Sequence, residues 1–150
     1  MSKRAEALTI RRAESHEHDA LEELQRRASL ALPDFREQLL ANPDAIELPI
    51  EQIVLRQVLV AELDGRVAGF AAVLIDEREA ELDGLFVEPE LWRRGVGRAL
   101  ADAATHAARR RGLSLRVVAS VAARGFYERC GFTVEGEEQT RFGPALRMTR

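Results

Sequence analysis

The chain is poor in cysteine and in long apolar runs, and each shortage excludes a class of protein. One of its 150 residues is cysteine, Cys130, so neither an internal disulfide nor a CxxC metal motif can form. No run approaches the ~20 apolar residues of a membrane span, and the N-terminus lacks the apolar stretch of a signal peptide. We therefore expect a cytoplasmic protein with no metal, no disulfide and no membrane partner.

Acidic and basic residues are concentrated in different parts of the chain. The formal net charge of −3 argues against a nucleic-acid partner, because nucleic-acid-binding domains are usually basic. Residues 14–51 carry ten acidic side chains and three arginines, whereas residues 92–124 carry eight arginines and one acid, Asp102. One interpretation is that the basic stretch binds an anionic ligand and that the acidic stretch binds a cationic ligand. The alternative is that both are solvated helix faces.

The length and the 46% of hydrophobic residues predict a single domain, residues 8–150, after a flexible N-terminal segment, residues 1–7. Hydrophobic periodicity and turn residues predict the order β-α-α-β-β-β-α-β-α-β-β, which is an α/β fold with an α+β mixed sheet. The expected strands are 8–12, 57–63, 66–75, 80–87, 113–119, 132–135 and 145–148, and the expected helices are 15–32, 34–41, 97–111 and 122–130.

The most specific local feature is a strand that breaks directly into a glycine-rich turn and a helix, LFVEPELWRRGVGRAL at residues 85–100. Gly95 and Gly97 allow a ligand to approach the backbone closely, so we expect a side chain at Gly97 to occupy the ligand's space. The free N–H groups and the positive dipole end of the helix meet there. Three arginines add positive charge, so the turn predicts a pyrophosphate cradle, meaning a site in which backbone N–H groups and arginines surround the phosphates. The alternative is a surface turn with incidental arginines. The arginines are Arg93, Arg94 and Arg98.

Two other phosphate-binding motifs are excluded by spacing. A Walker loop needs GxxxxGK[ST], which the chain does not contain. A dinucleotide fingerprint, GxGxxG, needs a third glycine where Leu100 stands, and an acid near the end of the next strand, where residues 115–117 read Leu-Arg-Val.

Three segments together resemble the GNAT superfamily of acyl-CoA-dependent N-acetyltransferases. They are the glycine-rich turn with its flanking strand and helix, the apolar strand LSLRVVAS, and AARGFYERCGF at residues 122–132. The family's Q/R-x-x-G-x-G/A loop fits from Arg94 to Ala99, whereas the register on Gly95 and Gly97 begins with Trp92. Ser120 stands where the family often has an asparagine that bonds the pantetheine arm.

The resemblance implies a splayed sheet with acetyl-CoA lying between strands 80–87 and 113–119. It implies that backbone groups of one strand pair with pantetheine and that the loop holds the pyrophosphate. It also implies that Tyr127 borders the cofactor and protonates the leaving thiolate. The implied cofactor-binding residues are Leu85, Phe86, Val87, Arg93, Arg94, Gly95, Val96, Gly97, Arg98, Ala99, Ser120 and Tyr127.

Two acids within a strand are the candidates for a catalytic base. A period of two places Glu81, Asp83, Leu85 and Val87 on one strand face. We expect Asp83 first and Glu81 second to accept the amine proton, directly or through water. The alternative is a solvated edge or a salt bridge to an arginine.

The expected reaction is acetyl transfer from acetyl-CoA to a primary amine by direct attack. The acidic first third favours a cationic acceptor, either a small molecule or a protein or peptide amine. The alternative function is a non-catalytic module that binds or senses acyl-CoA, and a homodimer is left open.

Overall fold

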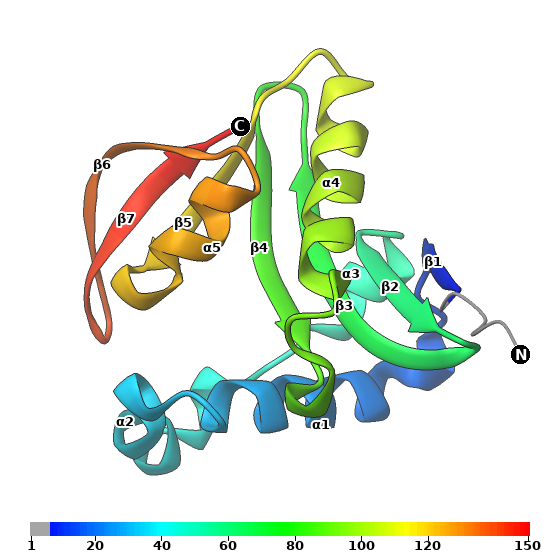
Figure 1. Ribbon diagram of the computed structural model, residues 1–150, viewed down its shortest axis with the longest axis horizontal. Coiled ribbons are helices and arrows are strands. Elements are labelled where there is room, and N and C mark those ends of the chain that lie inside the picture. The colour runs from blue at the N-terminus through cyan, green and yellow to red at the C-terminus, as the bar shows by residue number, and fades with distance from the viewer. Residues whose placement is uncertain (1–6) are drawn as a thin grey trace, which may run out of the picture.

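The computed structural model describes residues 7–150, which form one mixed sheet of seven strands in the order β1-β2-β3-β4-β5-β7-β6, with helices on both faces (Figure 1). The strands are β1 (Leu8–Arg12), β2 (Val58–Leu63), β3 (Arg66–Ile75), β4 (Ala80–Val87), β5 (Leu115–Ser120), β6 (Thr133–Thr140) and β7 (Gly143–Thr149). The helices are α1 (His18–Leu30), α2 (Arg36–Ala41), α3 (Ile50–Val54), α4 (Val96–Arg109) and α5 (Arg124–Arg129). Short 3₁₀ turns precede α1, α2, α4 and α5, and another covers Pro43–Ala45.

The predicted fold class and the predicted order of elements are confirmed, with one addition. The sequence prediction omits α3, and it ends β6 at residue 135 instead of Thr140. Of the expected flexible segment, residues 1–6 lie outside the described residues. Ala7 donates its N–H to an Asp64 carboxylate oxygen at 2.9 Å and accepts the Asp64 N–H at 2.9 Å.

Two hydrophobic cores lie on opposite faces of the sheet. Alternation along β2 demonstrates this, because Leu59 and Ala61 belong to one core whereas Val58 and Val60 belong to the other. The first core lies under α4 and α5, and the second lies under α1 and α3. No helix within residues 7–150 has both the length and the apolar character needed to span a bilayer.

The sheet separates in its middle, between β4 and β5 (Figure 1). These parallel strands pair only through residues 80–82 of β4 and 115–117 of β5, the last pair being Leu82 with Val117. Residues 83–87 continue along β3, while β5 continues along β7. The expected splay of the sheet therefore exists, and it divides the strands into a four-stranded part and a three-stranded part.

Candidate functional site

The free edge of β4 is the first component of the site. Beyond Leu82 this strand is bonded on one side only, with Leu85, Phe86 and Val87 opposite residues 71, 70 and 69 of β3. Its other side faces the gap, so backbone groups there are available to a ligand that adds as a strand. The structure thus brings the three predicted pantetheine-binding residues to the gap.

A β-bulge in β4 overturns the prediction that the two acids share a face with Leu85 and Val87. The register against β3 shifts between Ala72 and Val73, which leaves Asp83 as the extra residue. Leu85 and Val87 pack in the core under α4, whereas the Asp83 carboxylate accepts a hydrogen bond from Gln52 of α3, on the opposite face. A period of two cannot be extended through a bulge, so the acids and the apolar pair point to opposite sides of the sheet.

The turn before α4 provides a cradle of backbone donors. Gly95 has φ +82° and immediately precedes the helix, and Arg93 has φ +66°. The N–H groups of Val96, Gly97 and Arg98 open the helix, where no carbonyl four residues earlier lies inside the helix to accept them. The Trp92 indole N–H donates to the Val87 carbonyl at 2.9 Å, which ties the loop to the end of β4. The loop therefore adjoins the free strand edge.

The two glycines of this loop serve different purposes. A Cβ at Gly95 would meet no atom within 4 Å, so this position opens to the outside. A Cβ at Gly97 would lie 3.1 Å from the Phe126 ring and 3.7 Å from Leu85. A side chain at Gly97 would therefore first meet Phe126 and Leu85, so part of its effect would be on packing.

The arginines and Ala99 complete the loop in the predicted way. Arg93, Arg94 and Arg98 are exposed, and Ala99 is half-buried on the first turn of α4. Three guanidinium groups around a helix amino end make this part of the surface attractive to phosphate.

Tyr127 is almost fully buried on α5, with edge-on ring contacts to Phe126 and Phe132 at centroid distances of 5.0 and 5.3 Å. Burial, and secondly the nearby Cys130, raises the pKa of Tyr127 above its ordinary value. Its oxygen has no hydrogen-bond partner within residues 7–150. Thr149 holds the one fully buried side-chain oxygen of that range without a partner, so the Tyr127 oxygen must reach solvent. A neutral phenol with an accessible hydroxyl can donate a proton.

Ser120 ends β5, opposite Ala145 of β7, and is half-buried. It lies on the three-stranded side of the gap, where the sequence comparison with the family places a pantetheine contact. Its hydroxyl can both donate and accept a hydrogen bond.

Glu81 and Asp83 differ in their surroundings. Asp83 is exposed, and its carboxylate accepts a hydrogen bond from the Gln52 side-chain amide at 3.1 Å. Glu81 is partly buried, and this desolvation, followed by the negative charge of Asp83, raises the pKa of Glu81. The positive charge of Arg116 lowers the pKa of Glu81. A raised pKa brings a carboxylate closer to the range in which it accepts and returns protons near neutral pH.

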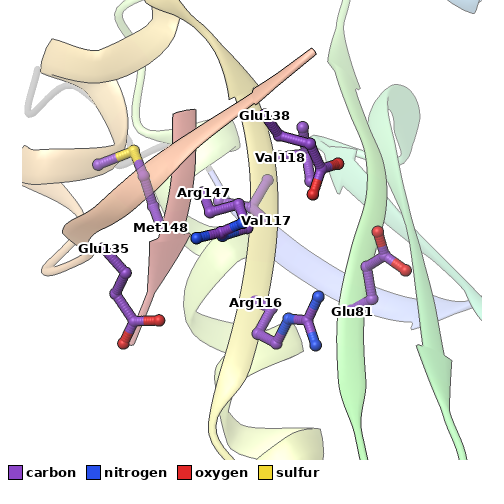
Figure 2. A pocket seen from close by; sticks show the side chains of 8 residues that line it. All are labelled: Glu81, Arg116, Val117, Val118, Glu135, Glu138, Arg147 and Met148. Atoms are coloured by element: carbon purple, nitrogen blue, oxygen red, sulfur yellow. The ribbon is translucent and has the colours of Figure 1, made fainter. Parts of the chain in front are cut away.

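A pocket of about 350 Å³ adjoins Glu81 on the face opposite α4 (Figure 2). It spans β4, β5, β7 and β6, so strands distant in sequence supply its charges. The sequence prediction named Glu81 but none of the other lining residues, because these meet only through the pairing of β5, β7 and β6. The lining residues are Glu81, Arg116, Val117, Val118, Glu135, Glu138, Arg147 and Met148.

One arginine connects the two parts of the divided sheet away from the strand pairs. Arg141, at the turn between β6 and β7, donates to both carboxylate oxygens of Asp44 at 3.1 and 3.3 Å. It also donates to the Asn42 side-chain oxygen at 2.9 Å. We call this contact the Arg141 bridge. Among residues 7–150, no group of three or more His, Cys, Asp or Glu side chains is arranged to hold a metal ion.

Comparison with known proteins gives a consistent result. A family model described as the acetyltransferase (GNAT) family matches residues 19–132. The PaiA N-acetyltransferase of Thermoplasma acidophilum, solved in complex with coenzyme A, shares 22% identity at a TM-score of 0.78, over 96% of this chain and 98% of that one. A GCN5-related N-acetyltransferase of Rhodopseudomonas palustris shares 21% identity at a TM-score of 0.77, over 99% of both chains.

A third solved structure is slightly more similar in sequence. The ribosomal-protein-S18-alanine N-acetyltransferase of Escherichia coli shares 26% identity at a TM-score of 0.65, over 95% of this chain and 92% of that one. No curated protein sequence matches this chain. At 21–22% identity, the first two structures demonstrate a shared fold.

Proposed function

Since the chain belongs to the GNAT acetyltransferase family, we propose that it transfers an acetyl group from acetyl-CoA to a primary amine. The observation that carries this proposal is the separation of β4 from β5 after Leu82, beside the amino end of α4. A free strand edge suits the amide groups of pantetheine, and a helix amino end with arginines suits a pyrophosphate.

The proposed cofactor contacts come from three places. Backbone groups of residues 85–87 pair with the pantetheine arm, so these contacts depend little on side-chain identity. The loop binds the phosphates through N–H groups and guanidinium groups, and Ser120 and Tyr127 border the arm from the opposite side. The loop residues are Arg93, Arg94, Gly95, Val96, Gly97, Arg98 and Ala99.

We assign the base to Glu81, with Asp83 second, which reverses the order that the sequence favours. An amine with an ordinary pKa near 10 must lose a proton before it attacks a carbonyl carbon. Glu81 is desolvated and its pKa is raised, whereas Asp83 is exposed and already bonded to Gln52. Glu81 accepts the proton, directly or through water, and Asp83 raises its basicity.

Tyr127 is the proposed acid. When the amine nitrogen bonds to the thioester carbon, the carbon–sulfur bond breaks and the sulfur leaves as a thiolate. The neutral phenol of Tyr127 donates its proton to that sulfur, and the nitrogen, which after the attack carries one proton more than the amide product, returns that proton to the phenolate. Holding the two reactants in one gap provides much of the rate, because the reaction becomes effectively unimolecular.

The acceptor is proposed to be a cationic amine before it loses its proton. Ten acidic side chains lie in residues 14–51, which include α1, α2 and the first two residues of α3. The helices α1 and α3 cover the face to which Glu81 and Asp83 point. Both a small molecule and a peptide amine fit this charge. The E. coli structure is named for acetylation of an alanine of a ribosomal protein.

The alternative is a module that binds acyl-CoA without catalysis. Measuring release of the CoA thiol with a panel of amines, beside calorimetric titration of CoA, distinguishes the two functions. The enzyme releases CoA in proportion to the amine, whereas a binding module titrates with CoA but releases none.

A further inference from the structure

The loop between β4 and α4, residues 88–95, begins with an acid whose side chain is largely covered. Glu88 directly follows the free edge of β4, and 16% of its side-chain surface is exposed. Its N–H donates to the Ala68 carbonyl at 2.9 Å, and its own carbonyl accepts the Leu91 N–H at 2.9 Å. Glu88 is therefore the point at which the strand ends and the loop takes its direction toward α4.

The Glu88 carboxylate is held by an arginine of α1. Both of its oxygens accept a hydrogen bond from the Arg27 guanidinium, one of them from Nε at 3.2 Å and the other from a terminal nitrogen. Figure 1 shows the loop crossing α1, and this ion pair joins the two. A guanidinium that bonds to both oxygens of a carboxylate fixes the orientation of that group as well as its position.

The helix α1 gives this arginine a rigid base. Leu21 and Leu24 are buried in the second core, and Ala28, the residue after Arg27, is buried as well. Side chains packed in this way keep a helix in place relative to the sheet. The ion pair therefore ties the start of the loop to a fixed element of the fold.

Trp92 reports on the same loop. Its indole N–H is bonded to the Val87 carbonyl, and the residue is 39% exposed, so its access to solvent can rise if the loop is released. Trp92 is the one tryptophan of the chain. Its fluorescence therefore describes the loop without a contribution from other parts of the protein.

We propose that Arg27 is a positioning residue for the phosphate-binding loop: by holding Glu88, it keeps the N–H groups at the start of α4 in the arrangement that a pyrophosphate requires. The proposal rests on the cofactor site proposed above and adds to it a residue from the opposite face of the sheet. The pair also cancels the negative charge of Glu88, which repels an anion. Positioning and cancellation of charge predict different results, and a set of variants separates them.

Three variants break the pair, and one neighbouring variant is the control. Arg27→Ala and Glu88→Ala each remove one partner. The double variant Arg27→Ala/Glu88→Ala lacks the pair but has the same net charge as the wild type. The control is Arg26→Ala, because Arg26 is the preceding residue and lies 3.6 Å from a Glu23 carboxylate oxygen within α1.

The first measurement is the quenching of Trp92 fluorescence by acrylamide in the protein without ligand. A loop released from α1 exposes the indole to the quencher. We therefore expect a higher quenching constant in both single variants and in the double variant, and the wild-type value in Arg26→Ala.

The second measurement compares, by calorimetry, CoA with pantetheine, which lacks the pyrophosphate and the nucleotide. The Kd of CoA should rise by about 3- to 10-fold in all three variants, as expected for the loss of one bidentate ion pair. The Kd of pantetheine should not change. Cancellation of charge alone predicts instead that Glu88→Ala binds CoA at least as tightly as the wild type and that the double variant binds it equally.

The outcomes separate this inference from the proposed function. Wild-type CoA affinity in the double variant overturns the inference, as does unchanged quenching of Trp92 or an equal loss of affinity for CoA and pantetheine. If CoA affinity depends on Arg27 as expected but no amine is acetylated, the positioning role stands and the transferase is overturned. A wild-type protein that binds no CoA overturns both.

Discussion

Gly97 and Phe126 lie so close together that a Cβ on the glycine would stand 3.1 Å from the phenyl ring. This contact joins the first turn of α4 to α5. The helix that opens the phosphate cradle and the helix that carries Tyr127 therefore position each other. A change at the contact should disturb both cofactor binding and the proposed acid.

Replacing Gly97 by valine should destabilise the protein by about 1–3 kcal/mol, because the added atoms overpack against Phe126. CoA affinity should fall as well, since the first N–H groups of α4 shift. Thermal unfolding and calorimetry measure the two effects. The double variant with Phe126→Leu should recover part of the stability.

Gly95→Ala is the matched comparison. It has open space but a left-handed backbone, so its cost of about 1–2 kcal/mol is conformational and Phe126→Leu should not relieve it. If CoA affinity were unchanged in Gly97→Val, the turn before α4 would not be part of the cofactor site.

Tyr127→Phe should fold normally, because the ring contacts with Phe126 and Phe132 remain. Without the hydroxyl, kcat should fall by about 10²- to 10⁴-fold, with little change in CoA affinity. Because burial raises the pKa of Tyr127 above 10, its ionisation should cause no loss of kcat in the wild-type protein below about pH 10. A phenylalanine variant as fast as wild type would exclude Tyr127 as the acid.

Glu81→Gln should lower kcat/KM by about 10²- to 10⁴-fold near neutral pH and recover partly at higher pH, where more of the amine is already neutral. The neighbours of Glu81 should shift the acidic limb of the kcat/KM profile in opposite directions. Asp83 raises the pKa of Glu81, so Asp83→Asn should move the limb to lower pH; Arg116 lowers it, so Arg116→Gln should move the limb to higher pH. Shifts of the same sign in both variants would contradict Glu81 as the base.

His18 should make stability depend on pH. One ring nitrogen lies 2.9 Å from an Asp19 carboxylate oxygen and the other 2.7 Å from the Leu48 carbonyl, and both contacts raise the pKa of His18. The contribution of His18 to folding stability is therefore complete below its pKa in the unfolded chain, about 6.5. It is lost as the pH rises through the higher pKa of His18 in the folded protein.

Urea denaturation measures this effect. The stability difference between wild type and His18→Gln should be larger at pH 5.5 than at pH 8.5, while His106→Gln, exposed on α4, should show no such change. A difference that grows with pH would be evidence against the His18 contacts.

The sequence predicts those parts of the protein that depend on local chemistry. The cradle could be predicted because Gly95 and Gly97 stand between a strand and a helix. The helix α3 could not, because five residues after Pro49 are too few for a periodic pattern. The bulge at Asp83 depends on the register against β3, and the pocket charges meet only through the pairing of β5, β7 and β6. Register and strand order are tertiary properties. For this reason the sequence predicted the wrong strand face for the two acids and did not indicate Arg147 as a lining residue of the pocket.

Only three residue pairs join β4 to β5, so a small rotation about these pairs moves the far end of β4 relative to β5. Residues 83–87 extend about 17 Å beyond the last pair, at ~3.3 Å per residue. A rotation of about 3° at that joint therefore moves the far end by about 0.9 Å, more than enough to misalign a nitrogen with a carbonyl carbon. The Arg141 bridge restrains the same movement from the other side. The alignment of the reactants thus depends in part on a short joint and on the Arg141 bridge, both remote from the atoms that exchange the acetyl group.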